Sequence, residues 1–172
     1  MEGGPVARAV LVSFGLRPTE ERDREWVRAL VAEHWGADFV VVHRTVYRPH
    51  ELPGFVAEDA HGQPLGLATY TIADRACELV TLNSLRERVG VGTALLDAVA
   101  GAARAAGCVR MWLIATNDNA HALAFYQKHG MRLVAVNRGA VDRSRSLKPS
   151  IPLVGAGGIP IRDEIELELR LE

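Results

Sequence analysis

The stretch "RERVGVGTALL", residues 86–96, decides how the rest of the chain is interpreted. Gly90 and Gly92 stand two residues apart, before a run typical of a helix and after "CELVTLNSL", which is typical of a strand. Such a turn often holds phosphate, because unpaired backbone N–H groups and the positive end of the helix dipole point at the anion. The stretch therefore predicts a local phosphate site, with an ordinary tight turn as the alternative.

Two common phosphate-binding loops are excluded by the same residues. A dinucleotide fingerprint needs a third glycine where Leu95 stands. A Walker A loop needs a Lys followed by Ser or Thr, which this stretch lacks. What remains is a short Gly-x-Gly turn between a strand and a helix.

Length and composition limit the function classes. The 172 residues predict one domain spanning 1–172, and a formal net charge of −1 argues against nucleic acid as a partner. Cys77 and Cys108 lack metal-ligand spacing and predict buried free thiols. No apolar run reaches the roughly 18 residues of a membrane span, and residues 1–10 lack the features of a secretion signal. We expect a cytoplasmic protein with no membrane partner, and a homodimer is left open.

Strand and helix patterns alternate on both sides of the glycine turn. Strands are predicted at 6–14, 53–59, 65–72, 76–83, 109–116, 131–137 and 165–171, with residues 38–47 a strand or an irregular extended segment. Helices are predicted from an N-cap at Thr19 to Trp35, over 93–106, and over 119–129 with Asn119 as the cap. Residues 138–163, here named the late segment, are rich in Pro and Gly and too long for a simple loop, which favours a lid or binding segment.

This order of elements, with two short motifs, resembles the GNAT superfamily of N-acetyltransferases. The loop signature of the family is matched from Glu87 to Leu96, with Glu87 where Gln or Arg is usual. The later signature is matched by Asn119, Ala122, Tyr126, Gly130 and Met131. The resemblance covers residues 78–136 well. It implies an α/β fold with a mixed, mostly antiparallel central sheet, flanked by helices and splayed between the strands near 79–84 and 109–116.

The resemblance also implies acetyl-CoA as the acyl donor and assigns its contacts. The pantetheine would pair with the strand backbone, and the pyrophosphate would lie on backbone N–H groups of residues 88–93 and on the Arg88 side chain. Glu87 is expected to face solvent. The cofactor-binding residues so assigned are Leu82, Asn83, Ser84, Arg88, Val89, Gly90, Val91, Gly92, Thr93 and Asn119.

Two residues are candidates for the proton transfers. Tyr126 is the candidate general acid, because a phenol with a reference pKa of about 10 is protonated at neutral pH and can donate to a departing thiolate; a core aromatic is the alternative. Glu78 is the candidate general base, on a face shared with Val80 and Leu82, where apolar surroundings should raise its pKa. A salt-bridged strand end, or a water chain as the base, stays open.

The sequence thus predicts an acetyl-CoA-dependent N-acetyltransferase that moves acetyl to a primary amine of a small molecule or peptide by direct attack on the thioester. The alternative is a non-catalytic acyl-CoA-binding or sensing module. The acceptor pocket is expected from residues 35–55 and 138–163, whose sequences identify no substrate.

Other polar residues are given structural roles. The six histidines show no metal-site spacing, so no zinc site is predicted, and His43 is assigned to the surface or to packing. Arg143, Arg145 and Lys148 are interpreted as a solvated face, with a substrate clamp as the alternative. The predicted core comprises Trp26, Leu30, Val80, Leu96, Val99, Trp112, Ile114, Phe125 and Val134.

Overall fold

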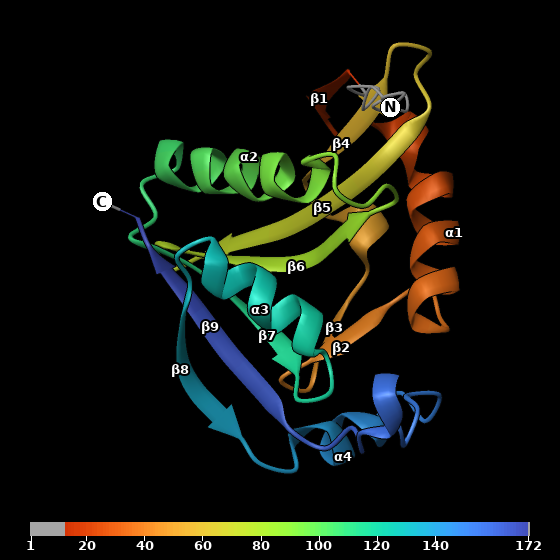
Figure 1. Cartoon of the computed structure of the whole chain (residues 1–172), viewed down its shortest axis with the longest axis vertical. Helices are drawn as coiled ribbons and strands as arrows, with labels where there is room; N and C mark the ends of the chain where they lie inside the picture. Colours follow the sequence, from red (N-terminus) through yellow and green to blue (C-terminus); the bar gives the residue numbers. More distant parts are fainter. Residues whose placement is uncertain (1–12, 172) are drawn as a thin grey trace, which may run out of the picture.

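A seven-stranded sheet with helices on both faces forms the body of the molecule in the computed structural model, which describes residues 13–171 (Figure 1). The strands of this sheet are β1 (Phe14–Pro18), β4 (Gly54–Asp59), β5 (Pro64–Ala73), β6 (Ala76–Ser84), β7 (Arg110–Thr116), β8 (Arg132–Asn137) and β9 (Glu164–Arg170). A separate hairpin comprises β2 (Val40–Val42) and β3 (Thr45–Tyr47). The helices are α1 (Arg24–Trp35), α2 (Val91–Ala105), α3 (Ala120–Lys128) and α4 (Ala140–Arg145), with 3₁₀ turns at Glu21–Asp23, Pro49–Glu51 and Ala156–Gly158.

The strand order is β1-β4-β5-β6-β7-β9-β8. Every neighbouring pair is antiparallel except β6 and β7, which are parallel. Parallel strands need a crossover connection, and α2 provides it. The predicted fold class, a mixed and mostly antiparallel sheet flanked by helices, is confirmed.

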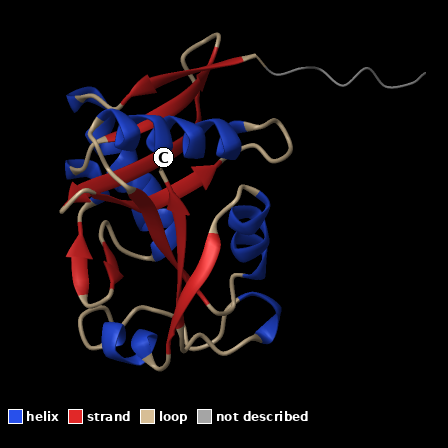
Figure 2. Ribbon diagram, turned by 90° about the vertical axis from the view of Figure 1, so that its left-hand side faces the viewer, coloured by secondary structure: helices blue, strands red, loops and turns tan. Residues whose placement is uncertain are grey.

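Helices lie on both sides of the sheet (Figure 2), and each face of the sheet has its own core. On one face α2 buries Leu95 and Val99 against Met111 of β7. On the other face α1 buries Val31 against Val56 of β4. Successive strand residues point to opposite faces, so one strand can serve both cores. Apolar residues on both faces thus fix the sheet between two layers of helix.

The first helix differs in part from its prediction. It ends at Trp35, and Gly36 takes the left-handed conformation (φ +72°) that a helix C-cap favours, as predicted. Thr19 does not cap it, because a 3₁₀ turn precedes α1 and the carboxylate of Asp23 accepts the N–H of Glu20 at 2.7 Å. The strand predicted at 6–14 lies largely outside the described residues, and β1 begins at Phe14.

The predicted core is right for Leu30, Leu96 and Val99, and wrong for Val134, which is 46% exposed. Val134 falls on the edge strand β8, at a register shift between Leu133 and Ala135, and faces solvent there. The remaining five predicted core residues are half-buried: Trp26, Val80, Trp112, Ile114 and Phe125. Cys77 and Cys108 are buried free thiols, as predicted.

A bulge in β6 changes which side chains share a face. Thr69 pairs with Thr81 and Tyr70 with Leu79, so Val80 is the extra residue. An extra residue shifts the two-residue alternation of a strand. Val80 packs on the α1 side and Leu82 against the α2 cluster. The prediction that Glu78, Val80 and Leu82 share one face is therefore wrong for Leu82.

Candidate active site

The parallel strands β6 and β7 separate after a short contact. They pair only between residues 76–78 and 110–112, and a cavity of about 470 Å³ opens beyond. We call the part between the strands the slot; it is lined by Leu79–Leu82 of β6, Leu113–Thr116 of β7, and Asn119, Ala122 and Tyr126 at and on α3. The splay predicted between these two strands is thus present, and the unpaired length of β6 faces an open space.

The glycine turn lies at the start of α2. Gly90 has a φ of +85° and is the N-cap, and Arg88 has a φ of +63°. The first helical N–H bond runs from Ala94 to the Gly90 carbonyl at 3.0 Å. The preceding N–H groups, at residues 91–93, have no acceptor within the helix. The turn therefore presents free donors and a helix dipole to one point in space, with the exposed Arg88 beside them. Glu87 is exposed, as expected.

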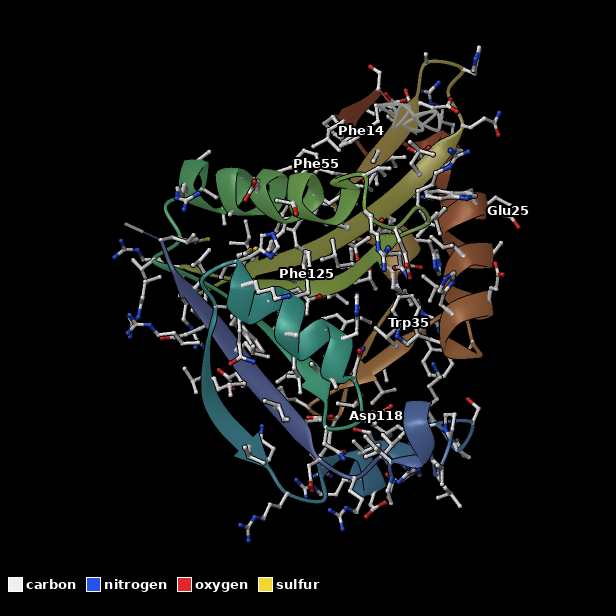
Figure 3. The ribbon with its side chains drawn as sticks, viewed as in Figure 1. Phe14, Glu25, Trp35, Phe55, Asp118 and Phe125 are labelled. Atoms are coloured by element: carbon white, nitrogen blue, oxygen red, sulfur yellow. The ribbon has the colours of Figure 1, made fainter. Side chains whose placement is uncertain are left out.

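Two of the predicted loop residues also join α2 to α3. A Cβ at Gly92 would lie 3.4 Å from Cζ of Phe125, which projects from α3 (Figure 3). The Thr93 hydroxyl and Nε2 of His129 are hydrogen-bonded at 2.9 Å. A Cβ at residue 92 would make ordinary contact with Phe125, so only a larger side chain there would press on α3. Val91 is buried and Val89 packs on the same core, so their side chains serve the fold.

The other predicted cofactor residues fall into different surroundings. Leu82 lines the slot, whereas Asn83 is buried and its Oδ1 has no hydrogen-bond partner. The Ser84 hydroxyl donates to the Arg86 carbonyl at 2.7 Å. Asn119 lines the slot and caps α3 by accepting the Ala122 N–H at 3.1 Å. This cap role was predicted. The cap uses only the side-chain oxygen of Asn119, so the amide nitrogen is not occupied by it.

Tyr126 lies in the wall of the slot, on α3. Burial raises the pKa of its phenol well above the ordinary value of 10.0, so the hydroxyl is protonated at neutral pH. Among residues 13–171 the hydroxyl has no hydrogen-bond partner, while the ring packs edge-on against Phe125 at 5.3 Å between centroids. The ring is thus held by packing and the O–H is left free to donate.

Glu78 lies where the two strands still pair, opposite Trp112, and it is buried without lining the cavity. Its Oε2 accepts the Tyr47 O–H at 2.6 Å. Burial raises the pKa of Glu78 above 4.5, and the Tyr47 hydrogen bond and the nearby His43 oppose that rise. A substrate in the slot therefore has no direct path to this carboxylate. Tyr47 is a neighbour that the sequence analysis missed.

The cavity continues past the slot into a second part, which we call the distal pocket. It is lined by residues from the end of α1 to β2 (His34, Trp35, Gly36, Val40, Val41 and Val42), by the late segment (Val141, Ser144, Lys148, Ser150, Ile151, Pro152 and Ile161) and by Glu164. Trp35 and the late segment lie on opposite sides of this region (Figure 3). Both stretches were expected to build an acceptor pocket, and they meet here.

The late segment is held in place by polar contacts to the end of β7. Asn117 donates from its side chain to the Pro160 carbonyl and accepts two backbone N–H groups, from Arg162 and Asp163. Asp118 lies beside the segment (Figure 3), and a Cβ at Gly155 would overlap its carboxylate. The segment is therefore an ordered wall of the cavity.

The interpretation of Arg143, Arg145 and Lys148 as a solvated face is correct only for Arg143. The Arg145 guanidinium donates to the carbonyls of Ile151, Pro152 and Ile161, which ties the late segment together. Lys148 is only 3% exposed, because α4 and the segment after it fold back over the cavity. A local pattern cannot reveal this folding back.

Glu164, the first residue of β9, was also missed. It is 2% exposed, lines the distal pocket, and lies opposite Thr116 where β7 ends. His43, assigned to the surface or to packing, donates its backbone N–H to Glu164 Oε1 at 3.4 Å, and its ring lies tilted against Trp112 at 5.8 Å between centroids. The available signal was the alternation of Glu164, Glu166 and Glu168, which places three acids on one face of the last strand.

Within residues 13–171 no helix is long and apolar enough to cross a membrane. No group of three His, Cys, Asp or Glu residues in this described part is placed to hold a metal ion.

Comparison with known proteins adds to this geometry. The protein YdhI of Bacillus subtilis, whose function is uncharacterised, is 44% identical over 148 residues, which is 86% of this chain and 92% of YdhI. An IAA acetyltransferase from Bacillus cereus has a similar structure, with a TM-score of 0.70 at 17% identity, over 92% of this chain and 100% of that one. An acetyltransferase from Bacillus subtilis in complex with CoA gives a TM-score of 0.64 at 17% identity, over 94% and 99% of the two chains.

The low identity to these solved structures means that they establish the fold alone. A sequence model of one family, however, matches residues 14–131, which include β6, the glycine turn, α2 and α3. Both motifs identified in the sequence fall inside this range. The chain belongs to the acetyltransferase (GNAT) family.

Proposed function

We propose that this chain is an acetyl-CoA-dependent N-acetyltransferase that moves an acetyl group to a primary amine by direct attack on the thioester. The observation that carries the proposal is the slot, which opens where β6 leaves β7 and has the free hydroxyl of Tyr126 in its wall. A held thioester, an approaching amine and a proton donor would meet there.

Acetyl-CoA would be held mainly by backbone groups. Its pyrophosphate would accept hydrogen bonds from the free N–H groups of residues 91–93, with the Arg88 side chain beside it. Its pantetheine would pair with the free edge of β6 near Leu82, Asn83 and Ser84, as an added strand. Such pairing fixes the position of the thioester and lowers the entropic cost of bringing the reactants together.

The transfer step needs two proton movements. As the amine nitrogen forms its bond to the thioester carbon and the carbon–sulfur bond breaks, Tyr126 would give its proton to the departing thiolate. Glu78 would receive the proton that the amine loses, through an intervening water, because this carboxylate does not line the cavity. Its raised pKa makes it a stronger base than an exposed glutamate.

Calorimetry combined with an assay of CoA thiol release tests this function. We expect acetyl-CoA to bind, and at least one member of a panel of primary amines and peptides to cause thiol release with an acetylated product. Binding without release across the panel would favour a non-catalytic acyl-CoA-binding module. Failure of acetyl-CoA to bind at all would exclude both functions.

A further inference from the structure

Two buried side chains of opposite charge line the distal pocket. Glu164 is 2% exposed and Lys148 is 3% exposed. They are the one carboxylate and the one ammonium among the described residues that line the cavity. Burying a charge is costly unless it is paired and hydrogen-bonded, so the number of partners decides how well each of these two side chains is satisfied.

Glu164 is incompletely satisfied. Its Oε1 accepts the Ser144 hydroxyl at 3.3 Å and the His43 N–H at 3.4 Å, both long for hydrogen bonds. Its Oε2 is buried and has no hydrogen-bond partner; the closest basic atom is Nδ1 of His43, at 3.4 Å. A carboxylate can accept about four hydrogen bonds. The carboxylate of Glu164, in the wall of the pocket, therefore keeps hydrogen-bonding capacity that the described residues do not use.

Lys148 has spare donors. Its ammonium gives one hydrogen bond, to the Phe39 carbonyl at 2.8 Å, and lies 5.1 Å from the centre of the Phe39 ring. No carboxylate of the described residues forms an ion pair with it, although an ammonium carries three N–H groups. Burial lowers the pKa of Lys148, and the charge of nearby Asp38 offsets this only in part.

The two charges belong to one local unit. The Ser144 hydroxyl donates to Glu164. The backbone N–H of Lys148 donates to the backbone carbonyl of Ser144 at 2.9 Å, one helical turn earlier. Around them the walls are mostly apolar: Trp35, Val40, Val42, Ile151, Pro152 and Ile161. The pocket thus offers one carboxylate that can pair with a positive charge, one ammonium that can pair with a negative charge, and an apolar surface.

We propose that the acceptor is a small zwitterion: a molecule that carries its amine and a carboxylate on an apolar body, as a hydrophobic amino acid does. This inference rests on the proposed function and names the substrate class for the same cavity. The acceptor amine pairs with the carboxylate of Glu164, its own carboxylate pairs with the ammonium of Lys148, and its apolar part packs on the walls. Both residues position the acceptor, and the transfer itself is the step described above.

Calorimetry on the CoA-loaded protein tests the class directly. The probes are the standard L-amino acids, with two matched sets that each lose one charge: leucine with isopentylamine and isocaproate, and phenylalanine with phenethylamine and phenylpropanoate. We expect at least one amino acid to bind, and the leucine or phenylalanine parent to bind at least about 30-fold more tightly than either single-charge relative, since removing one partner of a buried charge pair is costly. Equal affinity for parent and amine, or no binding of any amino acid by protein that binds CoA, overturns the inference and leaves acetyl transfer standing. Failure to bind CoA removes the proposed function and the inference with it.

Variants separate recognition from a structural role. Lys148→Met should reduce the affinity for the amino acid to that of its matched amine, with the amine itself unaffected; exposed Arg143→Met is the control. Glu164→Gln should weaken both ligands and leave acetyl-CoA affinity intact, with Glu166→Gln, which removes a partner of Arg110 on the same strand, as the control. The Glu164 variant should melt at or above the native temperature, because it removes an incompletely paired buried charge. A large drop in melting temperature together with loss of acetyl-CoA binding overturns the assignment.

Discussion

The slot and the distal pocket are parts of one cavity, but they are built in different ways. The slot, with the glycine turn beside it, comes from one continuous stretch, residues 79–126, and offers mainly backbone groups. The distal pocket comes from two segments far apart in the sequence, residues 34–42 and 141–164, and offers side-chain charges. Backbone donors suit a ligand whose shape does not vary, whereas side chains can be exchanged without disturbing the sheet. On the proposed function, this difference predicts that acetyl-CoA binding and the choice of acceptor can be changed separately in this molecule.

Substituting the proposed proton donor should have the largest effect. Tyr126→Phe keeps the packing against Phe125 and removes only the hydroxyl. Because general acids contribute about 10² to 10⁴ in rate, kcat should fall by about that factor for every amine, while acetyl-CoA affinity stays close to native. Single-turnover kinetics and calorimetry measure the two quantities.

The matched control is Tyr70→Phe, a half-buried tyrosine that stacks on Phe55 outside the cavity. It should leave turnover unchanged. Native turnover by the Tyr126 variant would mean that this residue serves packing alone and that the slot does not supply the proton donor.

Loss of the proposed base should have the next largest effect. Glu78→Gln should lower kcat/KM by about 10² at neutral pH, the lower end for general bases, because the proton would pass through water. Raising the pH should recover part of the loss, since an acceptor amine that is largely protonated at neutral pH then deprotonates unaided. A pH–rate profile identical to that of the native chain would exclude Glu78 from the mechanism.

Tyr47→Phe sharpens this test. The Tyr47 hydroxyl stabilises the carboxylate of Glu78 and so lowers the pKa of that group. Without it the pKa of Glu78 rises further, and the base is ionised only at higher pH. The acidic limb of the kcat/KM profile should therefore move to higher pH, with the plateau retained. A shift in the other direction would contradict the assignment.

The distal pocket should also be affected by substitution of Arg145, whose guanidinium holds the late segment together. Arg145→Met removes donors to three backbone carbonyls but keeps the alkyl stem. Hydrogen bonds from charged groups contribute about 1.5–3 kcal/mol, so unfolding should become easier by about that much. The KM for the amine should rise at least about tenfold, since the lower end of that range corresponds to slightly more than a factor of ten, with no change in acetyl-CoA affinity.

Urea unfolding, amine kinetics and acetyl-CoA calorimetry check this prediction together. Arg143→Met, on the exposed side of α4, is the control and should be native in all three. Equal weakening of acetyl-CoA and amine binding by the Arg145 variant would show that the two parts of the cavity are not separable.

The smallest effect is expected at the loop. Arg88 is exposed and has a positive φ, which Asn tolerates better than most residues, so Arg88→Asn should fold normally. An exposed charge contact contributes about 0.2–1 kcal/mol, so acetyl-CoA affinity should fall by at most about fivefold, less at high salt. Glu87→Gln should leave affinity unchanged or raise it slightly. A far larger loss in the Arg88 variant would mean that side chains rather than backbone hold the phosphates.

Prediction from sequence succeeded where the signal is local. The glycine before α2, the Asn119 cap of α3 and the presence of a strand over residues 109–116 are each decided within a few residues, and all are present. It failed where a single extra residue or a neighbour intervenes. The bulge at Val80 turned Leu82 to the other face, and the edge position of β8 exposed Val134.

By itself, the sequence determined the family, the order of strands and helices around the glycine turn, and the residues that border the slot, because those features depend on backbone propensity and short-range spacing. The tertiary structure alone decided that Glu164 and Lys148 would be buried together in one pocket, that Tyr47 would hold Glu78, and that Glu78 would lie outside the cavity wall. The physical reason is burial: whether a charged side chain meets water or protein depends on segments up to 121 residues apart, as between His43 and Glu164.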